Sequence, residues 1–355
     1  MPNRKKQLPP PLIMVKEIAR ATPGIWERLD RAIVEAVNYG YSWDSSTCPC
    51  PITVAIAGLM STGMTQTEAS ACAGIVAAAY AWRKTKRIYS FDSDLAEEVV
   101  STDGDLVIPV EVLHAMPAPC IYIQTGIIPG ADGFFAGVEY DVETHSEELR
   151  LYILDDNGNL IDACIIHLEQ GKTLQHGIDE AVKTMRKNIS NHEILRVFDG
   201  QLPPTVVSKI ENTRYISVKA VQLLLYVCAD NADIAENPEQ ARVYQKRQSI
   251  GDFPREIRKW DVGERIGEQI RVIRQQKRDM AKDDAIAKDD TVESDGISSP
   301  RKYKNRPHVR RAHWHHYWVG EGRTKLILKW VSTLIVNAED GELDTTIIKH
   351  KGAKS

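Results

Sequence analysis

The sequence lacks a hydrophobic run that could cross a membrane. Its longest uncharged apolar stretch, residues 69–82, has fourteen residues, half of them alanine, whereas a membrane-spanning helix needs about 20 apolar residues. The amino terminus is basic and proline-rich, and its only apolar run, Leu12 to Val15, is too short for the hydrophobic region of a signal peptide. We therefore expect a cytoplasmic protein with no membrane partner.

Motifs of the common enzyme classes are also missing. The chain has no P-loop, no nucleophile elbow and no dinucleotide-binding glycine pattern. Its six cysteines are scattered, and the pair Cys48-Pro-Cys50 has no second cysteine pair to complete a zinc site. These absences predict reduced thiols, no disulfide framework, no metal and no small-molecule cofactor.

Charge is unevenly distributed, although the 355 residues carry a net charge of only -4. Residues 301–330 contain nine Lys or Arg and the single acidic residue Glu321. Residues 282–295 contain six acidic residues and two lysines. The sequence therefore predicts a basic patch that follows an acidic linker.

The order of periodic patterns predicts an α+β fold with a helical N-terminal region, a central antiparallel sheet with flanking helices, and a C-terminal basic β-hairpin. The expected parts are a flexible basic leader (1–20), a helical region (21–104), an antiparallel sheet plus helices (105–262), a basic amphipathic helix (263–282), an acidic disordered linker (283–304), a basic-aromatic hairpin (305–338) and a flexible tail (339–355).

Local signals refine this outline. Thr22 and Pro23 predict the start of a first helix, and Thr65 with Glu68 predicts a capping box. Strands are expected at "DLVIPVEVL", "PCIYIQTGI", "FFAGVEYDVE", "ELRLYIL" and "LIDACIIHL", with a tight turn at Asn157-Gly158. Helices are expected at about 94–100, 173–190, 206–229 and 263–280.

The stretch "NRPHVRRAHWHHYWVG" at residues 305–320 is unusual because it holds four of the ten histidines and no acidic residue. We expect strands at 309–319 and 326–337, joined by "GEGR" at 320–323. Alternation along a strand separates the side chains into two faces. One face carries His313, His315 and Tyr317, with Arg311 before them, and the other carries Trp314, His316 and Trp318.

Four interpretations of this block remain open. A metal site would use His308, His313 and His315, but the block lacks cysteine and offers only Glu321 as a carboxylate. A metal-independent ribonuclease would use the same histidines as acid and base, with Arg310 or Arg311 stabilising the phosphorane. Nucleic-acid binding needs only arginines for phosphates and rings for bases. The tryptophans could also be core anchors.

The chain resembles the type V-A anti-CRISPR protein two family of phages and other mobile elements. The resemblance depends on three segments in the same order. They are "AYAWRKTKRIYSFD" (79–92), "VGERIGEQIR" (262–271) and "RPHVRRAHWHHYWVGEGRTKLILKW...VN" (306–337). The chain departs from the family pattern at Ala312, where glycine is familiar, and at 331–333, where proline is expected.

The resemblance implies an inhibitor of biosynthesis in the cytoplasm of a bacterial host cell. Its partners would be the nascent N-terminal peptide of a type V-A CRISPR nuclease and the nuclease's mRNA or translating ribosome. We expect host-defence evasion through loss of that mRNA and no catalysis by the chain itself, with a ribonuclease as the enzymatic alternative. The residues expected to contact nucleic acid are Arg306, Arg310, Arg311, His313, Trp314, His315, Tyr317, Trp318, Arg323 and Lys325.

Overall fold

The computed structural model describes residues 8–102, 106–141, 145–190, 204–237, 242–243, 256–289 and 308–336. The helices are α1 Pro10–Ala21, α2 Ile25–Asn38, α3 Ile52–Met60, α4 Gln66–Arg83, α5 Ser93–Val100, α6 Leu174–Ser190, α7 Pro204–Cys228 and α8 Glu264–Asp289, with short 3-10 segments at Val110–Ala115 and Glu321–Arg323. The strands are β1 Arg87–Phe91, β2 Cys120–Gln124, β3 Gly133–Asp141, β4 Ser146–Leu154, β5 Leu160–Leu168, β6 Ile234–Glu236, β7 Arg242–Val243, β8 Glu256–Val262, β9 His308–Arg310, β10 His313–Val319, β11 Lys325–Val331 and β12 Leu334–Val336.

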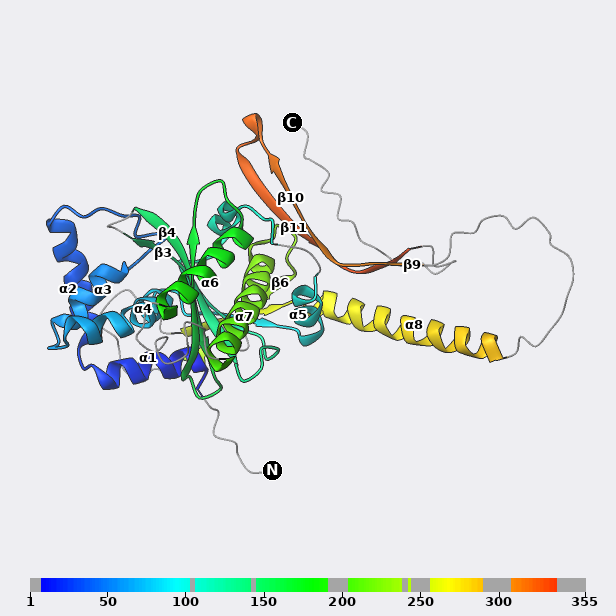
Figure 1. The fold of residues 1–355 in the computed structure, drawn as a ribbon, viewed down its shortest axis with the longest axis horizontal. Helices are drawn as coiled ribbons and strands as arrows, with labels where there is room; N and C mark the ends of the chain where they lie inside the picture. The colour runs from blue at the N-terminus through cyan, green and yellow to red at the C-terminus, as the bar shows by residue number, and fades with distance from the viewer. Residues whose placement is uncertain are drawn as a thin grey trace, which may run out of the picture.

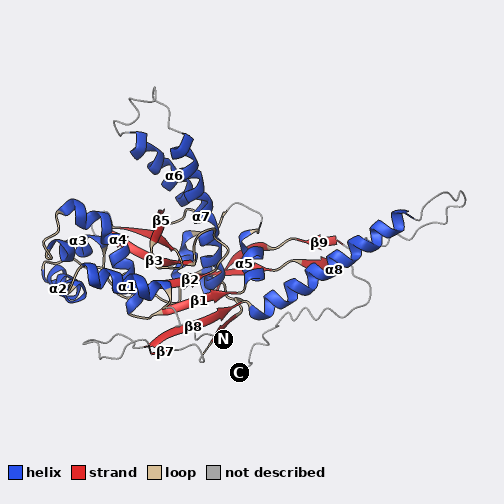
Figure 2. Ribbon diagram, turned by 90° about the horizontal axis from the view of Figure 1, so that it is seen from below, coloured by secondary structure: helices blue, strands red, loops and turns tan. Residues whose placement is uncertain are grey.

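The central sheet has the strand order β5-β4-β3-β2-β1-β8-β6, with β7 also paired to β8. Strands β2 to β5 form an antiparallel meander. Strand β1 is parallel to both β2 and β8. Because β1 leads directly into α5 and β8 into α8, these two helices leave the sheet from the same end (Figure 2). The α+β class is confirmed, and the sheet is mostly antiparallel.

Helices cover both faces of the sheet (Figure 1). On β3, Phe134 faces a core shared with α5, α6 and α7, whereas its neighbour Phe135 faces a core shared with α1 and α4. Strands buried on both faces read as continuous apolar runs rather than as alternating patterns. A third core joins α2, α3 and α4 around Ile25, Leu29 and Leu59, all at most 1% exposed. The helical N-terminal region is therefore built onto the sheet through α4.

Helix α4 shows how local sequence and packing agree. The predicted capping box is confirmed, because the Thr65 hydroxyl accepts from the backbone N–H of Glu68 and the Glu68 carboxylate accepts from the backbone N–H of Thr65. At Gly74 an added Cβ would lie 2.0 Å from the Tyr152 hydroxyl oxygen. Glycine at this position therefore allows α4 to approach β4 closely.

The amino-terminal part of the fold differs from the sequence-based expectation. The leader expected to be flexible over residues 1–20 is helical from Pro10, because Leu12 and Val15 bury their side chains under the sheet. Thr22 follows the end of α1 instead of capping the next helix. Gly24, with φ of 76°, occupies the N-cap position of α2.

One strand prediction is wrong, and four strands of the sheet, β1, β6, β7 and β8, were not predicted. The segment "DLVIPVEVL" forms no ladder strand in its described part and instead enters the 3-10 segment Val110–Ala115, since Pro109 cannot donate to a ladder. Strands β1 and β8 were not expected, because both follow basic residues that conceal their apolar positions. Strands β2 and β5 lie within their predicted segments, whereas β3 and β4 begin one and two residues before theirs.

The carboxy-terminal half matches its expected helices at α6, α7 and α8. Helix α8 continues to Asp289, so the first residues of the expected acidic linker 283–304 are helical. The rest of that linker and the expected tail 339–355 lie outside the described residues. Within the described residues, no helix combines the length and the apolar character that a bilayer crossing requires.

Candidate functional site

The basic-aromatic block folds as a β-hairpin that projects from the sheet (Figure 1). Strands β10 and β11 pair antiparallel, with Trp314 opposite Trp330 and Tyr317 opposite Ile327. A second antiparallel pair, β9 and β12, continues beyond a break at 311–312 and 332–333. Each predicted long strand is therefore two strands, because neither residue pair at the break belongs to a ladder.

One face of the hairpin is a packing face. Trp330 is 2% exposed, its ring meets Tyr226 edge-on at 5.5 Å between centroids, and its Nε1 donates to Thr102 Oγ1 at 3.1 Å. Leu328, also 2% exposed, and the half-buried Trp314 join the same core. The tryptophans Trp314 and Trp330 are therefore core anchors, as one of the four interpretations proposed.

Main-chain bonds hold this face against the loop after α7. Asn231 donates from Nδ2 to the carbonyl oxygen of Trp330 at 2.8 Å and accepts from its backbone N–H at 3.0 Å. The backbone N–H of Asp230 donates to the carbonyl of Leu328 at 2.9 Å. Strand β11 is thus docked by backbone contacts as well as by its side chains. Sequence reasoning missed Asn231, whose place in a polar loop gives no local signal.

The opposite face of the hairpin does not pack on the core; on it His315 is exposed, and His313, Tyr317 and Lys329 are half-buried. The rings of His315 and Tyr317 lie 5.6 Å apart, and Lys329 from β11 places its Nζ 5.7 Å from the Tyr317 ring centroid. The hydrogen bond with Tyr317 raises the pKa of Lys329. We call His313, His315, Tyr317 and Lys329 the exposed ladder. An ammonium group beside planar rings can contact a phosphate while the rings stack on bases.

The other predicted contact residues are dispersed around this ladder. Arg311 is exposed in the break, and Arg323 and Lys325 are exposed at the hairpin tip. Trp318 is 45% exposed, although it shares the face of Trp314. Arg306 lies outside the described residues, and so do the side chains of Arg310 and of the candidate catalytic residue His308 on β9.

The surroundings of the two ladder histidines decide which chemistry they could support. His313 and His315 alternate on one face, so about 7 Å separates their Cα atoms. Nδ1 of His313 lies 3.3 Å from the carbonyl oxygen of Arg311. None of the ion pairs found among the described residues joins these two histidines to a carboxylate. In the same part of the chain, no three His, Cys, Asp or Glu side chains converge as metal ligands.

A second constellation of charged side chains joins α5 and the residue before it to α8. Arg271 donates to Asp92 at 3.0 Å and to Asp94 at 2.7 Å, and these carboxylates raise its pKa. Arg274 donates to Asp94 at 2.5 Å and to Glu97 at 3.2 Å. We call this set of ion pairs the arginine clamp. It joins two of the segments that carry the family resemblance, since Asp92 ends the first and Arg271 ends the second.

Replacing Asp92 with Ala is expected to lower the free energy of unfolding by about 2 kcal/mol. Asp92 is 15% exposed at its side chain, accepts from the backbone N–H groups of Asp94 and Leu95, and pairs with Arg271. Glu97→Ala is the matched control, since the Glu97 side chain is 60% exposed and its pair with Arg274 should contribute about 0.5 kcal/mol. Urea unfolding measures both, and equal losses would contradict this assignment.

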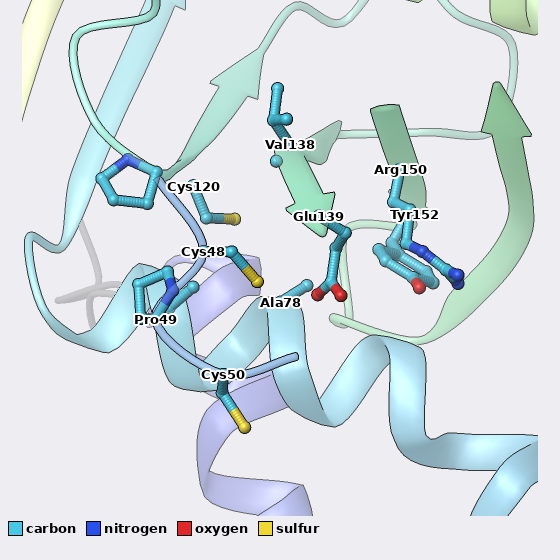
Figure 3. Close-up of a pocket in the computed structure, with 12 residues that line it drawn as sticks. Cys48, Pro49, Cys50, Ala78, Cys120, Val138, Glu139, Arg150 and Tyr152 are labelled. Atoms are coloured by element: carbon cyan, nitrogen blue, oxygen red, sulfur yellow. The ribbon is translucent and has the colours of Figure 1, made fainter. Parts of the chain in front are cut away.

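A small cavity lies on the far side of the sheet, beneath α4 (Figure 3). Three cysteines and Glu139 line it, together with Arg150 and Tyr152. Burial raises the pKa of Glu139 to about 8 and that of the Cys48 thiol to about 12. The Glu139 carboxylate also accepts from the backbone N–H of Ile52, at the start of α3. The buried carboxyl group of Glu139, on β3, therefore links the sheet to the helical region at α3.

The comparison with protein families covers the sheet, the clamp and the hairpin together. The model of the AcrVA2-like family, described as the anti-CRISPR type V subtype A2 family, matches residues 89–338. The chain belongs to this family. The resemblance found in the sequence is therefore confirmed. The first 88 residues, which include α1 to α4, lie before the range matched by the anti-CRISPR family model.

A curated protein and a solved structure are also similar to this chain. Protein FinQ of Escherichia coli is 26% identical over 266 residues, which is 68% of this chain and 75% of FinQ. The crystal structure of AcrVA2 aligns with 93% of this chain and 100% of its own length, with a TM-score of 0.58 and 15% sequence identity. At that identity the likeness shows a shared fold. The helical region outside the family model is therefore included in the structural alignment with AcrVA2.

Proposed function

We propose that this anti-CRISPR family member lowers production of a type V-A CRISPR nuclease. It would recognise the nuclease's nascent N-terminal peptide and cause loss of its mRNA in the bacterial cytoplasm. Membership of the family supports the anti-CRISPR role. The observation that carries the link to RNA is the exposed ladder, which presents Lys329 and three rings on a face that is not used for packing.

Co-expression with the nuclease tests the proposal. Both the transcript and the protein of the nuclease are expected to fall. Synonymous recoding of the opening codons keeps the peptide but changes the RNA, and the effect should persist. Removing the start codon keeps the RNA but removes the peptide, and the effect should disappear. Unchanged transcript and protein levels with the unmodified gene would overturn the proposal.

Binding of RNA by the exposed ladder has its own test. His315→Ala is expected to weaken affinity for single-stranded RNA about tenfold, because one stacking contact contributes about 1–3 kcal/mol. His316→Ala is the matched control, since His316 is the next residue and is also exposed but lies on the opposite face. Fluorescence anisotropy at several salt concentrations measures both. Equal losses would mean that the ladder is not the contact.

A histidine-dependent ribonuclease is the second candidate, because His313 and His315 share the solvent face of β10. One imidazole would take the 2′-hydroxyl proton and the other would protonate the leaving oxygen. Purified protein incubated with RNA and a chelator should then cleave it. His313→Ala should abolish cleavage while RNA binding persists. Cleavage that does not exceed the rate without protein would reject this candidate.

A further inference from the structure

Helix α5 connects the arginine clamp to the base of the hairpin. Its apolar side is fully buried, with Leu95, Ala96 and Val99 at 0% exposure. Just after the helix, the carbonyl oxygen of Thr102 accepts from Nε2 of Gln222 on α7 at 3.2 Å. Because both its apolar side and its end are fixed to the core, α5 is a rigid support for whatever its polar side binds.

Glu98, on the polar side of α5, binds two separate elements at once. Its Oε1 accepts a hydrogen bond from the hydroxyl of Thr333, which lies just beyond β11. Its Oε2 lies 3.6 Å from Nη2 of Arg274 on α8. The Glu98 side chain is only 17% exposed, and charge-assisted bonds in such surroundings are stronger than exposed ones. One carboxylate thus joins the hairpin to the clamp.

The position of Thr333 gives this bond its geometric effect. Thr333 lies in the break between β11, which ends at Val331, and β12, which begins at Leu334. It is 6% exposed. On the facing strand, Arg311 and Ala312 interrupt the ladder at the same level. The direction in which the β9–β12 pair leaves the docked β10–β11 pair is therefore set at the residue that Glu98 holds.

We propose that Glu98 is a positioning residue that fixes the angle between the β10–β11 pair and the β9–β12 pair. The inference depends on the proposed function only for its biological meaning, because β9 carries the predicted contact residue Arg310 and the candidate catalytic residue His308. Removing the Thr333 hydroxyl frees the β9–β12 pair to change direction while β11 stays docked through Trp330 and Asn231. In this role Glu98 acts through the direction of the β9–β12 pair and does not itself contact RNA or peptide.

The test compares three side chains at one position. Thr333→Val keeps the shape of threonine but cannot donate to Glu98, whereas Thr333→Ser keeps the hydroxyl. Spin labels at Val309→Cys on β9 and Glu268→Cys on α8, in a chain carrying Cys72→Ser, report the distance between the two elements. Wild type and Thr333→Ser should give one narrow distance distribution, and Thr333→Val should give a broader or displaced one. Identical distributions for all three would overturn the proposal.

Variants on the other side of the bond complete the test. Glu98→Ala should broaden the distribution at least as much as Thr333→Val, since it also loses the pair with Arg274. The double variant should add nothing to Glu98→Ala, because Thr333→Val removes a contact that Glu98→Ala has already removed. Arg214→Gln is the control and should leave the distribution unchanged, because Arg214 on α7 forms an exposed ion pair with Asp179 on α6. A double variant that broadens it by the sum of the two changes would also overturn the proposal. The distance result is independent of whether nuclease production falls in cells, so failure of the proposed function remains distinguishable.

Discussion

Replacing Trp330 with Ala is expected to lower the free energy of unfolding by about 3–5 kcal/mol, the range for truncating a buried tryptophan. Trp330 is 2% exposed and contacts Tyr226 on α7, so its removal leaves a cavity between the hairpin and the main core. Thr102 also loses the indole N–H that it accepts, although its hydroxyl still donates to the Glu98 carbonyl oxygen. Chemical unfolding measures the loss.

Two further variants separate packing from hydrogen bonding at this site. Trp330→Phe keeps much of the ring volume and is expected to cost about 1–2 kcal/mol. Trp318→Ala is the matched control on the same face of the hairpin, because Trp318 is 45% exposed, and it should stay within about 0.5 kcal/mol of wild type. If Trp318→Ala proved as costly as Trp330→Ala, the assignment of the packing face would be wrong.

Hydrogen exchange gives the same prediction a local readout. The backbone N–H groups of β11 should lose protection in Trp330→Ala before those of β3, since β11 is held to the body by few elements and β3 lies between two strands of the sheet. Equal loss of protection in both strands would mean that the hairpin and the sheet unfold as one cooperative unit.

The sequence predicted the meander and the hairpin well because their signals are local. The strands β2 to β5 alternate or run apolar between clear turns, and Gly158, with φ of 79°, occupies the expected tight turn. The two faces of β10 also follow from alternation alone. The exposure of Trp318 could not be predicted from alternation, because it depends on how far the docked part of the hairpin extends over the core.

Features that depend on distant partners could not be predicted. Strand β1 is central only because β8, which begins 165 residues after Phe91, pairs beside it. The leader was expected to be flexible because its composition is basic and proline-rich, yet Leu12 and Val15 pack against the sheet. The clamp did leave a signal, since Arg271 and Arg274 are spaced for one helix face while Asp94, Glu97 and Glu98 share another. Nothing in the sequence said that the two faces meet.

The buried carboxyl group of Glu139 is the strongest source of pH dependence that the cavity offers. Its pKa rises from an ordinary 4.5 to about 8, chiefly because burial disfavours the charged form; the charge of Arg150 and the Ile52 N–H act in the opposite direction. The residue is 9% exposed. Between pH 4.5 and 8 the folded protein therefore holds a proton that the unfolded chain has released.

Folding that takes up a proton becomes less favourable as pH rises. The contribution of Glu139 to the free energy of unfolding is thus fully retained below pH 4.5 and is lost progressively up to about pH 8. The difference between the two pKa values corresponds to about 4–5 kcal/mol, at 1.36 kcal/mol per pKa unit, as an upper value. Glu139→Gln stays neutral and keeps an oxygen for the Ile52 N–H, so it should remove this loss.

Unfolding by urea at pH 5, 6, 7 and 8 checks the prediction. The wild-type protein and Glu139→Gln should be of similar stability at pH 5, and the variant should be more stable by about 3 kcal/mol or more at pH 8. Other titrating groups are common to both proteins, so the difference between them isolates Glu139. Glu97→Gln is the control, because this exposed carboxylate should give a difference that is constant across the range. A constant difference for Glu139→Gln would show instead that its carboxyl is already ionised in the folded protein, because Arg150 and the N-terminus of α3 outweigh the effect of burial.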